Sequence, residues 1–538
     1  MYLAIPSYVV NDTMPSVAAA RYTVKDGDRI IWYYSKDMNE PPPKWDDLVK
    51  QAALGTVSPA AAAQQLADLL SGLQKGKLTP AEAITSISDL LGQLKSTDIT
   101  GELKEKLKGV VSTLSPLIAN MPEKAITKSE TGDGLLLKID PEAISDHLKA
   151  VRDASSLADK LVQLGVDDAA ALKPERLNLE VPPDAAAQKG FAVELPAEAL
   201  QEITSSGLGL AVISSEVSLS LPSVLLKEAF ESKQNLSGVE LTAAHIDAAK
   251  LNPFRGAGVI GNKAFDFAIK TITSDGKREP LRGGFAEKVK VTLSLEGIDL
   301  RGIDKNRLAV YRQKQDGSWE FVGGSLGEGA KSYSFETDRL SVYALMEYQN
   351  PFKDTENHWA RDAIEQMAMR LIVRGIGDDA FGPDQPLTRA QFAALLVRGL
   401  GLEQQPAPQP TFRDVAPDHW GYAPIEAAAK AGLVKGTGNG NFEPNRPVKR
   451  EEMATVLAVI LKQYGLSTGL TEAQASALLE RYTDSSQISA WARDGMAVCI
   501  DKGIISGRPD VTLAPRDQAT RAEAAVVLLK LLKLLGRL

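Results

Sequence analysis

The residues of this chain best suited to ligand chemistry recur three times near its C-terminal end, in a fixed order of aspartate, tryptophan, glycine and arginine. In each copy the tryptophan stands 16 residues before the glycine and 30 residues before the arginine. Arginine at a helix start can hold a carboxylate or phosphate, and tryptophan can pack on a sugar ring. The pattern predicts three sites for an anionic sugar, at Asp354, Trp359, Gly375 and Arg389; Asp414, Trp420, Gly436 and Arg450; and Asp484, Trp491, Gly507 and Arg521.

Each copy predicts two helices joined by a glycine-containing loop. We expect the tryptophan to open the first helix, with Trp359, Ala363, Met367 and Leu371 sharing one face. The second helix starts at the arginine. Distances between copies vary, with 61 residues from Trp359 to Trp420 and 71 from Trp420 to Trp491. Insertions of this kind are expected in the connections between packed units.

The start of the second helix carries a further signal. Thr388 and Thr520 each precede a Gln or Glu by three residues, which predicts capping boxes. Capping does not explain the arginine, because a cation in the first helical turn opposes the helix dipole. A ligand role is therefore favoured for the three arginines, whereas core packing remains open for the tryptophans.

The copies differ at five positions that bear on binding. Repeat one has Gln391 where Glu is usual, and repeat two has Lys449 in place of the capping threonine. Repeat three has Tyr482 and Leu513 in place of phenylalanines, and Pro509 in its loop. The third pocket is therefore the one expected to depart furthest from the common pattern.

The motifs Phe-x-Asp, His-Trp, Gly, Phe-x-Pro and Thr-Arg-Ala-Glu, three times over, resemble the S-layer homology (SLH) domains of bacterial cell-surface proteins. The resemblance implies an all-α pseudo-trimer whose grooves bind pyruvylated secondary cell wall polysaccharide on peptidoglycan without a covalent bond. By position, it implies that Arg389, Arg450 and Arg521 contact the ketal pyruvate carboxylate. The aspartates, tryptophans and glycines of the pattern would shape the sugar pocket.

The whole chain is expected to be a multidomain α+β protein. Residues 1–45 read as the remnant of a small β domain with an Asp26–Gly27 turn, which weakly resembles transcobalamin-like domains. Residues 46–175 read as helices, with capped starts at Ser58, Thr79 and Asp140. Residues 176–349 read as β-sandwich-like modules, and the SLH repeats are assigned to 350–406, 410–466 and 480–538.

Two short patterns locate strands in the sandwich-like region. Val289, Val291, Leu293 and Leu295 alternate with polar residues, which is typical of a strand with one buried face. Residues 308–322 predict a hairpin around Asp316–Gly317. Three aromatic residues of this region are expected in the core rather than on a carbohydrate platform: Tyr311, Trp319 and Tyr343.

Composition argues against several function classes. The 538 residues carry a net charge of −8, which is atypical of nucleic-acid proteins. Four scattered histidines predict no metal site, and His358 and His419 read as helix-start or surface residues. No catalytic motif or cofactor motif stands out. Cys499, the single cysteine, is expected to be a buried small hydrophobe.

The favoured interpretation is a non-enzymatic, extracellular surface protein held on the cell wall by residues 351–538. No membrane insertion is expected, because no apolar stretch reaches about 18 residues. No signal peptide is recognisable, so we expect a truncated N-terminus. Two alternatives stay open: a subunit of an S-layer lattice, which would self-associate, and the anchor portion of a larger wall-attached enzyme or binding protein.

Overall fold

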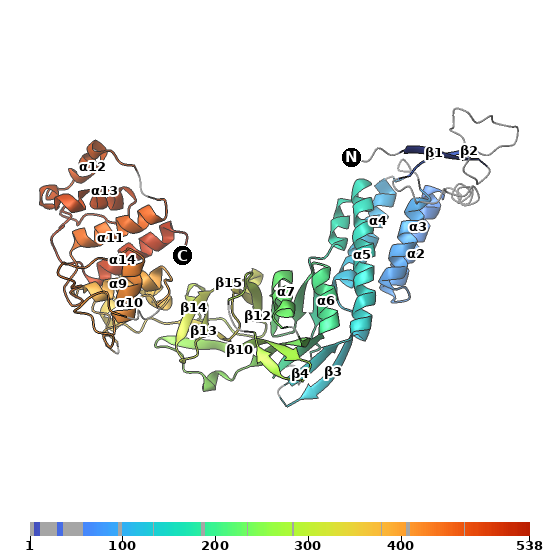
Figure 1. The fold of residues 1–538 in the computed structure, drawn as a ribbon, viewed down its shortest axis with the longest axis horizontal. Helices are drawn as coiled ribbons and strands as arrows, with labels where there is room; N and C mark the ends of the chain where they lie inside the picture. Colours follow the sequence, from blue (N-terminus) through green and yellow to red (C-terminus); the bar gives the residue numbers. More distant parts are fainter. Residues whose placement is uncertain are drawn as a thin grey trace. The chain divides into compact units, whose positions relative to one another are not determined.

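The protein is described here from a computed structural model that covers residues 5–10, 30–35, 57–94, 99, 101–132, 134–183, 189–233, 235–281, 284–377, 379–404, 409–466 and 469–538. Its contacts divide the chain into two compact units. Unit 1 comprises residues 1–187, 191–241 and 269–287, and unit 2 comprises residues 188–190, 242–268 and 288–538. Both units contain helices and strands (Figure 1), which confirms the α+β class.

The N-terminal part of unit 1 is a two-stranded antiparallel ribbon. β1 (Ile5–Val10) pairs with β2 (Ile30–Ser35), so that Ile5 lies opposite Ser35 and Val10 opposite Ile30. The predicted Asp26–Gly27 turn lies outside the described residues. The expected strand before that turn lies outside them as well.

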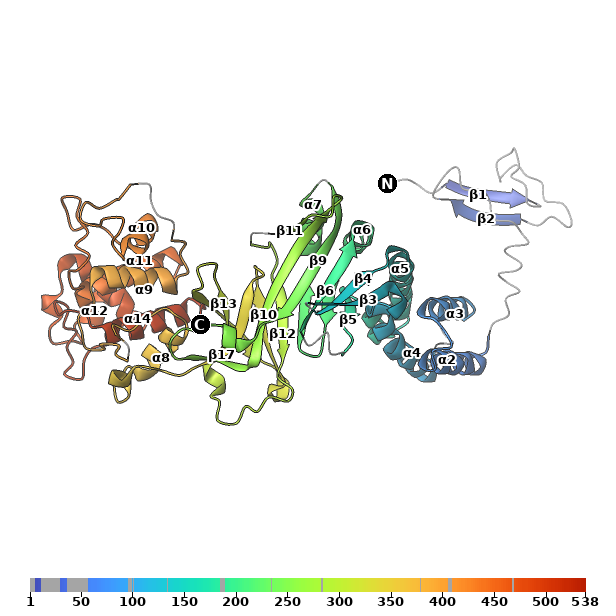
Figure 2. The ribbon, with the colours of Figure 1, turned by 90° about the horizontal axis from the view of Figure 1, so that it is seen from below.

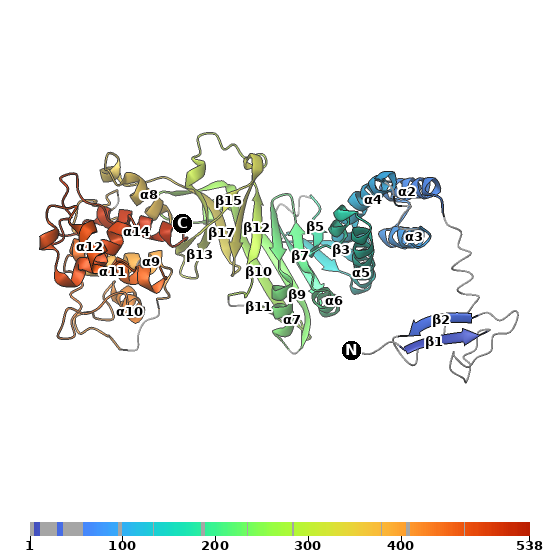
Figure 3. The same cartoon turned by 90° about the horizontal axis from the view of Figure 1, so that it is seen from above.

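Four longer helices follow in unit 1: α2 (Pro59–Gln74), α3 (Pro80–Gly92), α4 (Gly101–Ala119) and α5 (Pro141–Gln163). Three of them begin where the sequence predicts, because Ser58, Thr79 and Asp140 each accept a backbone hydrogen bond at a helix start. Helix α2 packs against α3 and α4, and α5 packs against α3 and α4 (Figure 3). The helices therefore form one bundle within this unit.

The region predicted to be helical, 46–175, also contains a β-hairpin. β3 (Ile126–Thr131) pairs antiparallel with β4 (Gly134–Ile139), and β4 lies parallel to β6 (Gly190–Pro196). The side chains of β3 after Ile126 are exposed, so this strand lacks the alternation that would reveal it in the sequence. A sequence pattern therefore identifies half-buried strands better than edge strands.

A second sheet of unit 1 contains β5 (Arg176–Glu180), β7 (Gly209–Ile213) and β8 (Val217–Leu221), in the order β8-β7-β5. Two helices interrupt the region predicted to be β-rich: α6 (Ala197–Ser205) and α7 (Ser223–Glu231). These helices pack on each other, and α5 packs on α6 (Figure 2).

Two long strands have residues in both units: β9 (Leu236–His245) and β10 (Ala257–Thr273). Within unit 2, β10 borders β17 (Val342–Tyr348), followed by β13 (Leu308–Gln313) and β14 (Trp319–Gly323). The predicted hairpin around Gly317 is β13–β14, and the predicted strand from Val289 is β12 (Val289–Ser294).

The second sheet of unit 2 has the order β15-β16-β12, with β15 (Ser325–Leu326) and β16 (Ser332–Thr337). It packs face to face on the first sheet. The ring centroids of Phe335 and Tyr343 are 5.1 Å apart, and the Tyr333 hydroxyl donates to the Leu308 carbonyl at 3.0 Å. Tyr311, Trp319 and Tyr343 are buried, as expected of core aromatics. The sandwich-like prediction is confirmed here.

The C-terminal segment of unit 2 contains three helix pairs. They are α8 (Arg361–Met369) and α9 (Arg389–Gly399), α10 (Tyr422–Lys430) and α11 (Arg450–Gln463), and α13 (Arg493–Asp501) and α14 (Arg521–Leu534). An additional helix, α12 (Glu472–Leu479), occupies the longer connection before the third repeat. This helix accounts for the wider tryptophan spacing there.

The three repeats form a closed ring. The first helix of each repeat packs on the second helix of the preceding repeat. Helix α10 packs on α9 and α13 on α11 (Figure 1), and α8 packs on α14. Three backbone bonds close the ring: Val448 N–H donates to Leu387 O, Ala519 N–H to Val448 O, and Leu387 N–H to Ala519 O, at 2.8–2.9 Å. This cyclic bonding gives the segment its pseudo-threefold arrangement.

Candidate ligand-binding junctions between the repeats

The three arginines of the repeated pattern connect neighbouring repeats. Arg389 Nε donates to the Phe442 carbonyl at 2.7 Å, Arg450 Nε to the Leu513 carbonyl at 2.8 Å, and Arg521 Nε to the Phe381 carbonyl at 2.9 Å. Each acceptor lies in the loop of the next repeat around the ring. We call the three contacts the Arg389, Arg450 and Arg521 junctions.

The helix starts at these arginines are also occupied. Arg389 N–H donates to Arg446 O at 3.0 Å and Ala390 N–H to Pro444 O at 2.9 Å, and the corresponding amides of α11 and α14 bond in the same way. Amides at the start of a helix are its free donors. The first two amides of each helix donate to the next repeat, so neither of them is available to an anion at these helix starts.

Burial affects the charge at two of the junctions. Removal from water disfavours the charged form, and burial accordingly lowers the pKa of the Arg389 and Arg521 guanidinium groups. Each of the two groups also stacks on an aromatic ring. The Arg389 guanidinium lies 4.4 Å from the centre of Phe442, and that of Arg521 lies 4.6 Å from the centre of Phe381.

The aspartates of the pattern organise the loops of their own repeats. The Asp354 carboxylate accepts from the Phe381 and Gly382 amides at 2.7–3.0 Å. Asp414 accepts from the equivalent amides of repeat two at 2.6–2.7 Å, and Asp484 from those of repeat three at 2.7–2.8 Å. Because both oxygens of each carboxylate bind backbone, these residues position the loop that the arginine contacts.

The glycines give space to an aromatic ring of the same repeat. A Cβ atom on Gly375 would lie 2.6 Å from Phe352 Cε1, one on Gly436 3.1 Å from Phe412 Cε1, and one on Gly507 2.3 Å from Tyr482 Cε1. Such distances leave no room for a methyl group. The sequence interpretation linked these glycines to a sugar pocket, whereas in the structure the close approaches are to a Phe or Tyr ring and to a carbonyl oxygen of the loop.

The tryptophans are exposed. The exposed fraction is 67% for Trp359, 57% for Trp420 and 59% for Trp491, whereas Ala363 and Met367 of the first helix are buried. The prediction that Trp359 shares a face with these residues was wrong, because α8 begins only at Arg361 and Leu371 has a left-handed backbone, with φ of 59°. Core packing, the alternative that the sequence left open, is thereby excluded.

Each tryptophan lies beside one junction. Trp420 precedes Gly421, whose added Cβ would lie 3.2 Å from the Ala390 Cβ, next to Arg389. Near Trp491, the Ser489 hydroxyl donates to Glu451, the neighbour of Arg450, at 3.1 Å. Each of these two tryptophans thus stands in the segment that contacts the helix start of a junction arginine.

The same placement holds at the third junction. His358, the neighbour of Trp359, contacts Asp384 at 3.3 Å, and the adjacent Pro383 carbonyl accepts from the Ala522 amide beside Arg521. His358 and His419 each accept a hydrogen bond from the backbone amide two residues on, at the start of α8 and α10. The helix-start prediction for these histidines is confirmed.

The predicted capping boxes and the single cysteine can be located in the structure. The capping boxes at Thr388 and Thr520 are present, with Gln391 and Glu523 as their partners. Cys499 is fully buried, and burial raises its thiol pKa to about 12. Among the described residues, no helix is long and apolar enough to cross a bilayer. The sequence did not reveal the cyclic order of the arginine contacts, since nothing in one repeat names its partner.

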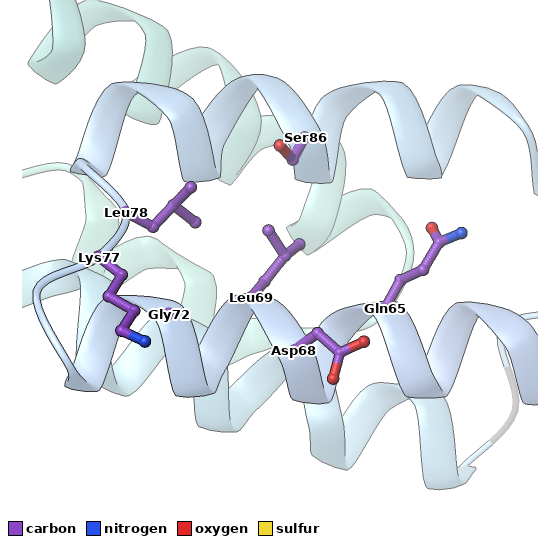
Figure 4. Close-up of a pocket in the computed structure, with 7 residues that line it drawn as sticks. All are labelled: Gln65, Asp68, Leu69, Gly72, Lys77, Leu78 and Ser86. Atoms are coloured by element: carbon purple, nitrogen blue, oxygen red, sulfur yellow. The ribbon is translucent and has the colours of Figure 1, made fainter.

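Unit 1 contains a separate hollow between α2 and α3 (Figure 4). Polar and apolar side chains line it together: Gln65, Asp68, Leu69, Gly72, Lys77, Leu78 and Ser86. None of the residues in the repeated pattern lies there. The predicted site residues are instead gathered in the ring of unit 2.

The family comparison assigns this ring. The S-layer homology domain model matches residues 351–393, 411–454 and 481–525. The chain contains three S-layer homology domains. This segment is accordingly a cell-wall anchoring module. Residues 7–36 match a second model, the domain of unknown function DUF4430.

Similar proteins share parts of the chain. An amylopullulanase of Thermoanaerobacterium thermosulfurigenes is 30% identical over 347 residues, which is 64% of this chain and 17% of that protein. The exoglucanase XynX of Acetivibrio thermocellus is 37% identical over 182 residues, 34% of this chain and 16% of that protein. The S-layer protein sap of Bacillus anthracis is 33% identical over 181 residues, 34% of this chain and 21% of that protein.

The lengths of these matches show how much of each relative and of this chain is shared. The chain spans less than a fifth of the length of the amylopullulanase and of the exoglucanase. The match to the amylopullulanase contains more residues than the segment from 351 to 538, so the similarity extends beyond the three SLH domains.

Proposed function

We propose that the S-layer homology ring holds a surface protein on the bacterial cell wall by non-covalent binding of pyruvylated secondary cell wall polysaccharide. The observation that carries the proposal is the exposure of Trp359, Trp420 and Trp491, each beside an inter-repeat arginine. Large exposed aromatic side chains commonly mark binding sites, and an indole offers a flat apolar face to a sugar ring.

The positive charge in this proposal comes from among the three junction arginines, Arg389, Arg450 and Arg521. A guanidinium held by backbone carbonyls is fixed in position, which lowers the ordering cost of binding a carboxylate. A ketal pyruvate presents one carboxylate on a sugar ring. The indole and the guanidinium together match such a group, with the sugar on the tryptophan and the carboxylate on the arginine.

Repeated junctions around the ring also suit a polymer. A repeating polysaccharide can occupy more than one junction at once, and the second contact is then intramolecular. Weak binding at each junction would give firm attachment to the wall. Self-association into a surface layer, the lattice alternative, is supported by the S-layer proteins among the similar sequences.

We also propose, as a second candidate, that the ring is the anchor of a larger wall-attached enzyme. This candidate is favoured by the match to the amylopullulanase, which extends beyond the S-layer homology ring and yet covers 17% of that relative. Within the present chain the proposed role is anchoring, without catalysis.

The test uses sedimentation of the full-length chain with isolated cell walls, before and after chemical extraction of the secondary polymer. The variant replaces Trp359, Trp420 and Trp491 together by alanine. Because these side chains are exposed, the triple variant should keep its fold and helical circular dichroism. The control variant is Arg301→Ala, at an arginine whose side chain is 91% exposed and which lies outside the ring.

The wild-type chain and the control should sediment with unextracted walls and lose binding after extraction. The triple tryptophan variant should stay in the supernatant in both cases. Equal sedimentation of the triple variant and the wild type would refute the role of the tryptophans. Sedimentation that extraction leaves unchanged would refute the secondary polymer as the ligand.

A further inference from the structure

We propose that the anionic group binds at the Arg389 and Arg521 junctions and that Glu523 closes the Arg450 junction against it. This inference rests on the proposed function and adds which of the three junctions are open. The difference follows from side chains that the three repeats do not share.

At the Arg450 junction, every guanidinium nitrogen has a partner. Nε donates to Leu513 O at 2.8 Å, Nη2 donates to Ser506 O at 3.4 Å, and Nη1 forms an ion pair with Glu523. Arg450 is only 5% exposed. Each of its three nitrogens is thereby engaged by the protein, and its charge is already compensated by Glu523.

At each of the other two junctions, the protein's hydrogen bonds use two of the three guanidinium nitrogens, Nε and Nη2. Arg389 donates from Nε and Nη2 to the Phe442 and Lys435 carbonyls at 2.7 and 2.6 Å. Arg521 does the same to Phe381 and Arg374, at 2.9 and 2.7 Å. Within the described part of the chain, neither Nη1 atom has a hydrogen-bond partner. Arg521 is 9% exposed, so its free donor belongs to a largely buried cation.

The junctions differ in one residue of the neighbouring repeat, which stands three positions after the N-cap of its second helix. Glu523 accepts from the Thr520 amide through Oε2 at 3.0 Å and uses its other oxygen for Arg450. The corresponding residue at the Arg521 junction is Gln391, which accepts from the Thr388 amide at 3.1 Å and carries no charge. Arg521 therefore has no carboxylate partner from that position.

The Arg389 junction has a carboxylate at the same position, but another arginine holds it. Glu452 accepts from the Lys449 amide at 2.8 Å and from Arg446 Nη2 at 2.7 Å. Arg446 also pairs with Glu443 at 2.9 Å. Glu452 is thereby diverted from Arg389, which stays available to an external anion.

Nearby aspartates do not change which of the junctions are open. Asp354 is the carboxylate that acts on the Arg521 charge, and Asp414 acts on Arg389 together with Glu443 and Glu452. Both aspartates spend their oxygens on backbone amides of the loop. The ion pair to the arginine itself is found only at the Arg450 junction, among the residues that the structure describes.

Two exchange variants test the inference on the full-length chain and leave every arginine in place. Gln391→Glu puts a carboxylate at the Arg521 junction in the arrangement of Glu523, and Glu523→Gln removes the carboxylate from Arg450. Both variants keep a side chain that can close the capping box. Gln474→Glu is the matched control, because Gln474 caps α12 through the Thr471 amide at 2.9 Å and lies at no junction.

The binding probe is a methyl hexoside that carries a 4,6-ketal of pyruvate, titrated into each protein in a calorimeter. We expect about two sites per chain for wild type and control, one for Gln391→Glu and three for Glu523→Gln, since each exchange changes one charge-assisted contact. Melting temperatures confirm that each variant is folded. Equal site numbers in all four proteins, or loss of sites in Glu523→Gln, would overturn the inference.

Wall sedimentation of the same proteins separates the two proposals. Gln391→Glu should weaken wall binding about tenfold, as expected for one lost charge-assisted contact. If the hexoside binds in the expected order and no protein sediments with walls, the inference stands and the proposed function falls. If wild type sediments with walls and the exchanges change neither binding nor site number, the function stands and the inference falls. Binding of wild type to neither probe would overturn both.

Discussion

Replacing Gly375 by alanine should loosen the loop that the Arg521 guanidinium contacts. The new Cβ would lie 2.6 Å from Phe352 Cε1 and 2.8 Å from the Ala380 carbonyl oxygen. Phe352 is buried against Phe381, with ring centroids 5.7 Å apart, so the ring cannot turn aside freely. Overpacking of this kind costs about 1–3 kcal/mol.

The loop contains its own reporters for this cost. The Phe381 amide is bonded to Asp354, and the Ile376 amide donates to Ala380 O at 3.0 Å. Hydrogen exchange of peptides covering residues 374–382 should accelerate by roughly 5- to 150-fold, which corresponds to about 1–3 kcal/mol. Local exchange is the better measure here, since global unfolding of a protein with several units is not two-state.

Gly377 provides the control within the same loop. A Cβ on Gly377 would meet no atom within 4 Å, so Gly377→Ala should leave the protection of the loop nearly unchanged. Equal exchange in Gly375→Ala and wild type would refute the packing argument. Loss of wall binding in Gly375→Ala with unchanged protection would instead support the sequence prediction that the glycine faces the sugar.

Two further predictions follow from buried groups of the ring. Asp484→Ala should raise hydrogen exchange in its loop more than Asp354→Ala does in repeat one. Asp484 is buried, and its loss leaves two amides unpaired at about 1–3 kcal/mol each, whereas water can reach the exposed Asp354 site. Similar exchange in both variants would contradict this reasoning. Cys499 should resist iodoacetamide at pH 8 in the folded protein and react after unfolding. The thiol pKa of about 12 in the folded protein lies above the reference value of 9.0. The buried neutral thiol therefore stabilises the folded state fully below pH 9, and this contribution is lost as the pH rises toward 12. Rapid native labelling at pH 8, followed by mass spectrometry, would contradict the burial.

Much of the local structure could be predicted from the sequence. The proline-linked caps at Ser58, Thr79 and Asp140 set helix starts because the capping side chain acts within one turn. The alternation from Val289 gave β12 for the same reason, since side chains of a strand alternate in direction. The hairpin of residues 126–139 was not predicted, because its outer strand is exposed and carries no apolar alternation.

The site was identified in part. The twelve residues of the pattern and the helix start at each arginine could be predicted from the sequence, since spacing and caps are local properties. The sequence misjudged Trp359, because the helix that this residue was expected to open begins only at Arg361, after Ala360. It also linked the glycines to the sugar and did not reveal the aromatic neighbour, because the ring of Phe352 is brought to Gly375 by folding.

The partner of each arginine was decided only by the tertiary structure. Arg521 bonds to Phe381, 140 residues earlier in the chain, because the ring closes the third repeat onto the first. The same closure places Gln391 opposite Arg521 and Glu523 opposite Arg450, so that repeats with one pattern acquire different charge balance. Sequence by itself determined that three helix starts carry an arginine; the ring determined which of those charges is already compensated.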